Sequence, residues 1–154
     1  MADSVITDEM RRIVGVETGE SIAEVTTTGC RLFARATGHT DLIFYDEAVA
    51  RQRGYRSIVA PPGYLGTPIY RPGEEEPHLS GPPIPYRRGL NGGTAYEYLE
   101  TVVAGDVITA RGKITKYHER QGSIGPMLIT YRETTFTRQD GTAVAKMYGN
   151  VINY

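Results

Sequence analysis

The chain lacks several features that would assign it at once to a large class of proteins. Its 154 residues contain a single cysteine, Cys30, and no tryptophan. One cysteine excludes an internal disulfide and is typical of a reducing compartment, so we expect a cytoplasmic protein. No apolar run approaches the roughly 20 residues that cross a bilayer. The polar residues 1–12 lack the apolar core of a secretory signal. We therefore expect no association with a membrane.

Positive charge is not in excess either. Lysine and arginine together number 17 against 18 acidic residues, for a formal net charge of -1. Without a run of basic residues, nucleic acid is not expected as a partner. The length fits one domain that covers residues 1–154. Tyrosine is plentiful, with eleven residues, and tyrosine can line a pocket while its hydroxyl stays hydrated.

The first half of the sequence predicts short helices. Apolar residues recur at helical spacing in three segments, and hydroxyl or carboxylate side chains stand where they can cap the first turn. Asp46 is placed to cap the third of these helices, and Gly38 to end the second. The predicted helices cover residues 3–14, 29–37 and 47–53, and a short strand is expected over residues 21–25.

The second half predicts β-strands. After Gly89 the sequence is rich in Val, Ile, Thr and Tyr in alternating patterns, and Gly105-Asp106 and Asp140-Gly141 are turn signals between antiparallel strands. Helices followed by a run of strands predict an α+β domain with one antiparallel sheet. The predicted strands cover residues 95–101, 106–120, 127–137 and 143–154.

A proline-rich segment joins the two halves. Pro61 and Pro62 suit the first turn of a helix, where the missing N–H would have no partner. We predict such a helix through Gly66, and it is the most apolar candidate to cover the sheet. Residues 68–88 hold six prolines and the run Glu74–Glu76. This composition predicts a long surface excursion without helix or strand.

Four segments together resemble one family. Residues 37–46, Thr-Gly-His-Thr-Asp-Leu-Ile-Phe-Tyr-Asp, are similar to the hydratase loop of MaoC-like (R)-specific enoyl-thioester hydratases. Residues 60–65 resemble the Ala-Pro-Pro segment that opens the central helix in the N-terminal MaoC, or fatty-acid-synthase-I-like dehydratase, branch. Residues 90–98 resemble its Gly-Gly strand, and residues 104–108 its Pro-Gly-Asp turn. The resemblance implies a hot-dog fold, an antiparallel sheet wrapped around a central helix.

The chain departs from this family where the family transfers protons. The family's loop aspartate and histidine activate water for addition to the double bond, which is general acid–base catalysis. Here His39 stands in the aspartate position, Asp41 in the asparagine position and Phe44 in the histidine position. Phenylalanine cannot carry a proton. The usual catalytic pair is therefore missing, and His39 and Asp41 are only weak candidates for a substitute pair.

The backbone N–H donors that would bind the thioester carbonyl are also fewer than in the family. In the family a backbone N–H at the start of the central helix does this. Pro61 and Pro62 have no N–H to donate, whereas Gly63 has one.

The resemblance therefore implies a subunit of a 2-enoyl-CoA or 2-enoyl-ACP hydratase, a 3-hydroxyacyl-thioester dehydratase of fatty acid or lipid metabolism, whose chemistry is supplied elsewhere. We expect an acyl thioester as ligand, with no cofactor and no metal. The expected partner is a catalytic MaoC-like sister subunit in a heterodimer or heterotetramer, or a second copy in a homodimer. Two alternatives stay open: a self-sufficient enzyme that uses His39 and Asp41, and a non-enzymatic acyl-thioester-binding module. The expected groove residues are Phe44, Tyr45, Pro62, Gly63 and Tyr64.

Overall fold

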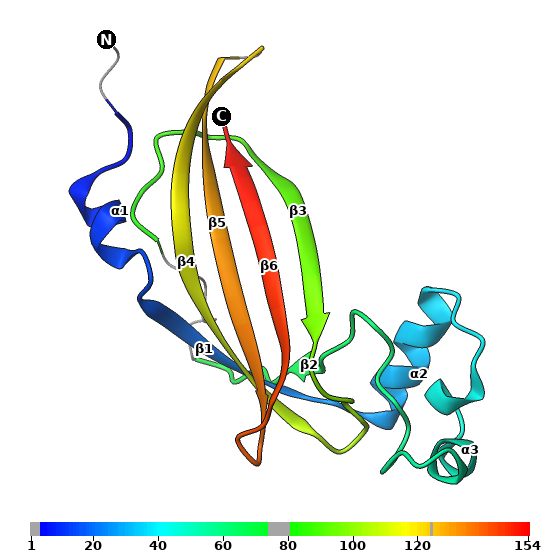
Figure 1. Ribbon diagram of the computed structural model, residues 1–154. Helices are drawn as coiled ribbons and strands as arrows, with labels where there is room; N and C mark the ends of the chain where they lie inside the picture. Colours follow the sequence, from blue (N-terminus) through cyan, green and yellow to red (C-terminus); the bar gives the residue numbers. More distant parts are fainter. Residues whose placement is uncertain (1–3, 74–80, 124) are drawn as a thin grey trace.

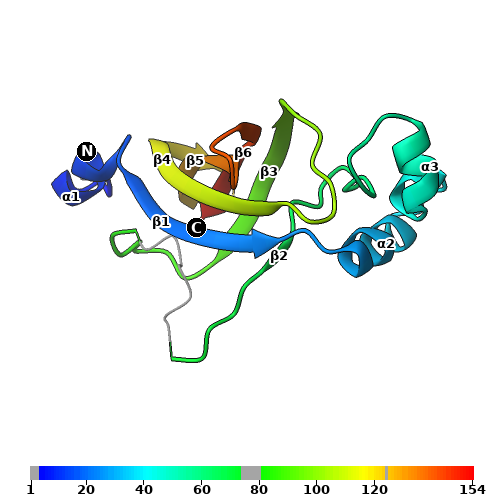
Figure 2. The same ribbon diagram turned by 90° about the horizontal axis from the view of Figure 1, so that it is seen from below.

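The molecule is built on one curled antiparallel sheet. The computed structural model describes residues 4–73, 81–123 and 125–154. Six strands run in the order β2-β1-β4-β5-β6-β3, and the sheet curls into a half-barrel (Figures 1 and 2). The strands are β1 (Glu17–Glu24), β2 (Thr67–Pro68), β3 (Gly89–Tyr98), β4 (Val107–Gly122), β5 (Gly125–Arg138) and β6 (Ala143–Asn153).

The helices form where capping side chains precede them. Helix α1 (Asp8–Ile13) begins after Thr7, α2 (Thr27–Ala36) after Thr26, and α3 (Glu47–Gln52) after Asp46. In each case the capping side chain accepts a hydrogen bond from the backbone N–H three residues further on, which would otherwise have no partner. The three predicted helices are thus confirmed, although α1 is shorter than expected.

The four strands predicted after Gly89 are confirmed, and burial alternates in β4 over residues 107–114. Strand β3 begins at Gly89, six residues earlier than predicted, since its glycines pair with β6 without contributing the side chains on which the prediction relied. Strand β1 likewise starts at Glu17, four residues before the predicted strand.

The helix predicted to open at Pro61-Pro62 is wrong. One turn forms, in which the Tyr64 N–H donates to the Pro61 carbonyl at 3.0 Å, and the chain then continues without helix into β2. Gly63 and Gly66 have φ values of +93° and +104°, and this left-handed conformation interrupts a right-handed helix. Helices α2 and α3 lie beyond one end of the sheet instead (Figures 1 and 2).

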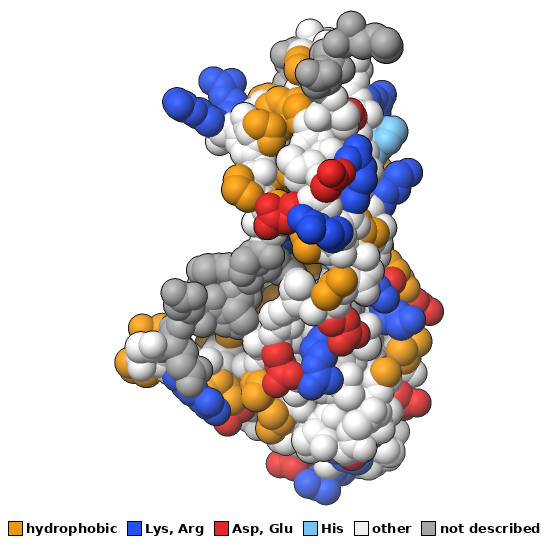
Figure 3. All heavy atoms as spheres, turned by 90° about the vertical axis from the view of Figure 1, so that its left-hand side faces the viewer, with side chains coloured by type: hydrophobic (Ala, Val, Ile, Leu, Met, Phe, Trp, Pro, Cys, Tyr) orange, Lys and Arg blue, Asp and Glu red, His pale blue; other side chains and the backbone are white. Residues whose placement is uncertain are grey.

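The two faces of the sheet differ in composition. We call inner the face that carries Thr130, Thr134 and Phe136 of β5, and outer the opposite face. The outer face carries ion pairs between neighbouring strands, Arg111–Glu20 at 2.6 Å and Lys113–Glu133 at 3.1 Å. Positive and negative side chains are also interspersed on the side of the molecule that carries α1 (Figure 3).

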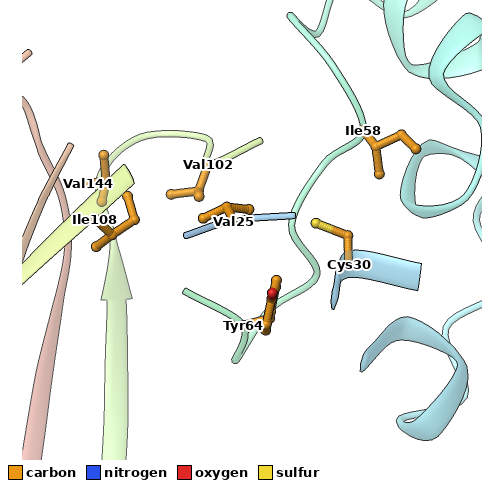
Figure 4. Packing of buried hydrophobic residues seen from close by; sticks show 7 residues of the cluster. All are labelled: Val25, Cys30, Ile58, Tyr64, Val102, Ile108 and Val144. Carbon is orange, nitrogen blue, oxygen red and sulfur yellow. The ribbon is translucent and has the colours of Figure 1, made fainter. Parts of the chain in front are cut away.

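The core joins α2 to one end of the inner face. Cys30 of α2 is fully buried, and burial raises the pKa of its thiol to about 11, so the thiol stays protonated at neutral pH. Phe136 of β5 packs at the edge of the same cluster. The buried members, shown in Figure 4, are Val25, Cys30, Ile58, Tyr64, Val102, Ile108 and Val144.

The excursion between β2 and β3 connects opposite edges of the sheet, so its path must pass from one edge to the other. Its described part includes Gly81, where an added Cβ would lie 3.7 Å from Ile114 and 3.8 Å from the Tyr117 hydroxyl, both on β4. Residues 74–80, with the predicted acidic run Glu74–Glu76, lie outside the described residues.

Candidate functional site

A cavity of about 440 Å³ lies where three segments meet: the 3-10 helix η1 (Leu42–Phe44), the chain through residues 59–65, and the connection that leaves β3. Most of its wall is apolar, as is usual for sites that take small organic ligands. The lining residues are Ile43, Phe44, Val59, Ala60, Pro62, Tyr64, Leu65, Tyr98, Leu99, Glu100, Thr101 and Val102.

Backbone hydrogen bonds hold these three segments together. The Val59 N–H donates to the Ile43 carbonyl at 3.0 Å, and the Ala60 N–H donates to the Val102 carbonyl at 2.9 Å. Val59 also forms an isolated β-bridge with Val103. The walls of the cavity are therefore fixed by main-chain contacts.

A buried carboxylate anchors the wall from behind. The Asp106 side chain is only 1% exposed, and the Arg56 guanidinium donates to its two oxygens at 3.0 and 2.9 Å. The Val103 N–H donates to the same carboxylate at 3.0 Å. Asp106 thereby links Arg56, which precedes the cavity-lining residues 59–65, to Val103 in the connection after β3.

Phe44 lines the cavity, and His39 lies behind it. The two rings have centroids 5.1 Å apart and are tilted by 52°. The His39 N–H donates to the Ala34 carbonyl at 2.9 Å, which closes the loop after α2. His39 is not among the residues that line the cavity. Of these two rings, only the phenyl ring of Phe44 lines the cavity.

Asp41 serves the local structure of the loop. Its carboxylate accepts from the Ile43 N–H at 3.1 Å, which caps η1, and from Arg53 at 2.8 and 2.9 Å. These hydrogen bonds, first the one from Ile43 and then those from Arg53, lower the pKa of Asp41. A carboxylate held in its charged form and already hydrogen-bonded is a weak proton acceptor.

Tyr45 also stabilises the loop and is absent from the cavity lining. Its hydroxyl donates to the His39 carbonyl at 2.6 Å, and its own carbonyl accepts from Arg31 at 2.8 Å. The structure therefore places Tyr45 behind the cavity, whereas three of the five predicted groove residues, Phe44, Pro62 and Tyr64, line it.

Tyr64 lines the cavity and also belongs to the core cluster. It is 8% exposed, and its ring lies 5.6 Å from that of Phe33. A Cβ at Gly29 would lie 1.9 Å from the Tyr64 hydroxyl, so the first turn of α2 leaves room for this ring. The hydroxyl is 3.1 Å from that of Thr67.

The Gly63 N–H is already hydrogen-bonded. It donates to the Tyr98 hydroxyl at 2.5 Å, and Tyr98 itself lines the cavity. The Tyr98 ring stacks on that of Tyr96 with a centroid distance of 5.9 Å. Sequence reasoning missed Tyr98. Two tyrosines two residues apart in a predicted strand were the available signal, since such residues share one face.

Metal ligands and membrane-spanning helices are not found in the described part of the chain. Among residues 4–73, 81–123 and 125–154, no group of three or more His, Cys, Asp or Glu side chains is placed to hold a metal ion. No helix within these ranges is long and apolar enough to cross a membrane.

Comparison with known proteins agrees with this architecture. The family model described as "FAS1-like, dehydratase domain region" matches residues 12–147. A UPF0336 protein of Streptomyces griseus subsp. griseus is 32% identical over 94 residues, which are 59% of this chain and 61% of the relative. The chain spans about three-fifths of the length of the first curated relatives that it matches.

Solved structures with the same fold include two complexes from Mycobacterium tuberculosis. One is the truncated HadBC (3R-hydroxyacyl-ACP dehydratase) complex, with a TM-score of 0.67, 21% identity and coverage of 92% of this chain and 97% of the other. The second is the ChsH1-ChsH2 complex, with a TM-score of 0.67, 17% identity and coverage of 90% and 89%.

A third structure, described as a MaoC-like dehydratase, has a TM-score of 0.68, 19% identity and coverage of 92% and 42%. At these identities the structural likeness shows the fold alone, and the match of the family model over most of the chain shows the family. The chain belongs to the FAS1-like dehydratase family and has the hot-dog fold of MaoC-like dehydratases.

Proposed function

We propose that this chain is the groove-forming, non-catalytic subunit of a heteromeric 2-enoyl-thioester hydratase or dehydratase. The observation that carries the proposal is Phe44. In this family a histidine is expected at its place in the loop, and the phenyl ring there forms part of the cavity wall. A site with an apolar ring in this place can hold an acyl chain but cannot move a proton.

The neighbouring polar groups do not replace the missing histidine. Asp41 caps η1 and binds Arg53, while His39 packs its ring on Phe44 outside the lining of the cavity. General acid–base catalysis needs a group within hydrogen-bond reach of the reacting atoms. The arrangement therefore supports a proton donor and acceptor supplied by another chain.

The donor for the thioester carbonyl supports the same proposal. A preorganised N–H stabilises a developing oxyanion only if it points at that oxygen. In the segment from Pro61 to Gly63, the remaining N–H donates to Tyr98 instead. A thioester carbonyl would have to displace the Tyr98 hydroxyl before it could use this donor.

The edge of the sheet next to the cavity offers a place for a partner. Strand β3 is the edge strand, all ten of its residues are exposed, and within the described chain it pairs on one side only, with β6. Unpaired strand edges are readily extended by a strand of another chain. Because β3 ends at Tyr98, a catalytic subunit paired there would lie beside the cavity.

Hydration of crotonyl-CoA tests the proposal. The purified chain alone is expected to give no turnover, and the chain mixed with a MaoC-like sister protein chosen for its intact aspartate and histidine is expected to give turnover. Substantial turnover by the chain alone would contradict the non-catalytic role. If the chain binds CoA esters but gives no turnover either alone or with a sister protein, it is better described as a non-enzymatic binding module.

A matched variant separates the self-sufficient enzyme from the heteromer. His39→Ala removes the one imidazole of the loop, whereas its backbone hydrogen bonds with Ala34 and Tyr45 stay available. We expect the mixture with the sister protein to keep its turnover. If the variant folds, as circular dichroism would report, but the mixture loses turnover, the histidine takes part in the chemistry after all.

A further inference from the structure

An unpaired arginine lies on the inner face of the sheet. Arg132 follows Thr130 and precedes Thr134 on β5, and residues two apart along a strand point to the same face. Its cross-strand neighbours are Ile114 on β4 and Gly149 on β6. Gly149 has no side chain, so the space beside Arg132 on the β6 side stays open.

Within residues 4–73, 81–123 and 125–154, the Arg132 guanidinium has no anion to pair with. Its Nε is buried and has no hydrogen-bond partner, and no carboxylate of the described residues forms an ion pair with it. Loss of hydration on burial lowers the pKa of Arg132, which the nearby Tyr117 opposes only in part. Buried polar groups without partners are uncommon, and in native proteins they often mark a place where a ligand, water or ion binds.

Two further buried atoms on the same face lack partners. The Thr130 side chain is 1% exposed, and its hydroxyl oxygen has no hydrogen-bond partner. The Asn153 side-chain oxygen on β6 is in the same situation, and Asn153 pairs with Leu128, two residues from Thr130. A polar region with two donors, the Arg132 Nε and the Thr130 hydroxyl, and one acceptor, the Asn153 side-chain oxygen, thus lies on the inner face.

Aromatic rings extend from the cavity toward this region. Tyr98 lines the cavity and stacks on Tyr96, whose ring lies 6.4 Å from that of Phe136. Phe136 and Arg132 are four residues apart on β5, which corresponds to roughly 13 Å along the strand. A ligand that enters the cavity and extends past these rings along the inner face of β5 would bring its far end to the guanidinium.

We infer that the acyl group held by this chain carries a carboxylate at the end remote from the thioester, and that Arg132 binds that carboxylate. The planar guanidinium presents donors in a fork that matches a carboxylate, and a charge-assisted pair of this kind is strongest away from water. The Thr130 hydroxyl is placed beside it as a further donor. The inference rests on the proposed function, because it names the class of acyl thioester that the groove would hold.

Calorimetric titration of the full chain with two CoA esters of equal carbon number tests the inference. Dodecanedioyl-CoA ends in a carboxylate, and dodecanoyl-CoA ends in a methyl group. We expect dodecanedioyl-CoA to bind the unmodified protein about tenfold more tightly or better, since a hydrogen bond to a charged group is stronger than one between neutral groups. This comparison needs no variant, so it does not depend on how a substitution folds.

Variants on the two faces provide the control. Arg132→Met is expected to remove the preference for the dicarboxylic ester and to leave the affinity for dodecanoyl-CoA unchanged. Arg111→Met, which makes the same change on the outer face in the pair with Glu20, is expected to leave both affinities unchanged.

The possible failures are distinguishable. If neither ester binds the unmodified chain, the groove-forming function fails and the inference with it. If both esters bind equally well, the function stands and the role of Arg132 is refuted. If Arg132→Met weakens both esters by the same factor, the arginine recognises the phosphates that the two esters share, which also refutes the inference.

Discussion

Two charged groups, one buried and one partly buried, stand in opposite situations in this molecule. The Asp106 carboxylate, at the turn behind the cavity, accepts hydrogen bonds from the Arg56 guanidinium and from the Val103 N–H. The buried Nε of Arg132, in the middle of the inner face, has no partner. A buried charge with its partners in place fixes the local fold, whereas a partly buried charge without them is a cost to the folded chain that a ligand can offset.

The largest effect is expected when the paired charge loses its partner. Arg56→Ala leaves the Asp106 carboxylate buried with only the Val103 N–H, and we expect a loss of about 2–3 kcal/mol in the free energy of unfolding. Urea denaturation followed by circular dichroism measures the loss. A loss below about 0.5 kcal/mol, the size of an exposed ion pair, would mean that water replaces the guanidinium without cost.

Removal of the unpaired charge is expected to raise the free energy of unfolding. Arg132→Met keeps much of the side-chain volume and removes a cation that is partly dehydrated, so we expect a gain of about 1 kcal/mol. The same urea titration, run beside Arg56→Ala, measures it. A loss of stability comparable to that of Arg56→Ala would contradict the contrast between the two sites and would mean that Arg132 supports the fold.

The sequence predicted the parts of the fold that depend on neighbouring residues. The caps at Thr7, Thr26 and Asp46 act within one helical turn, and strand alternation repeats every two residues. Both patterns can therefore be recognised in the sequence without knowledge of tertiary contacts. The helix at Pro61 failed because the prediction weighed the prolines and not the two glycines that follow. Gly63 adopts a left-handed conformation that ends the turn.

The site was predictable only in part, for a related reason. The place of Phe44 in the loop followed from the family's motif. The hydrogen bond from the Gly63 N–H to the Tyr98 hydroxyl joins residues that are 35 positions apart. No local sequence pattern predicts such a contact. Alternation assigns Arg132 to one face of a strand, but only the folded chain reveals that no carboxylate within its described part meets it there.

A smaller effect is expected for an ion pair on the outer face. Lys113 and Glu133 are 3.1 Å apart, and their side chains are 34% and 21% exposed. Lys113→Ala should therefore cost about 0.5 kcal/mol or less, and added salt should reduce the difference from the unmodified protein. Urea titrations at low and high salt measure this. If Lys113→Ala lowers the free energy of unfolding as much as Arg56→Ala does, the burial of Asp106 does not explain the difference expected between the two ion pairs.

The smallest effect is expected at Asp41, where the charge is exposed and fully partnered. The hydrogen bonds from Ile43 and Arg53 lower its pKa in the folded chain. The resulting stabilisation is present above the pKa of the unfolded chain, near 4, and is lost as the pH falls through the lower folded value. Asp41→Asn should therefore show a shallower loss of melting temperature than the unmodified protein when the pH is lowered below about 4.

The same variant bears on chemistry, because a capping carboxylate and a catalytic base respond differently to its replacement. Asn can still cap the 3-10 helix through its side-chain oxygen, so a structural Asp41 predicts that hydration by the complete heteromer keeps its rate and its pH profile. A catalytic Asp41 predicts that the acidic limb of that profile disappears together with the rate. The melting temperature and the pH profile of the rate thus report on the two roles separately. A changed pH profile with an unchanged melting temperature would indicate that Asp41 of this chain transfers protons.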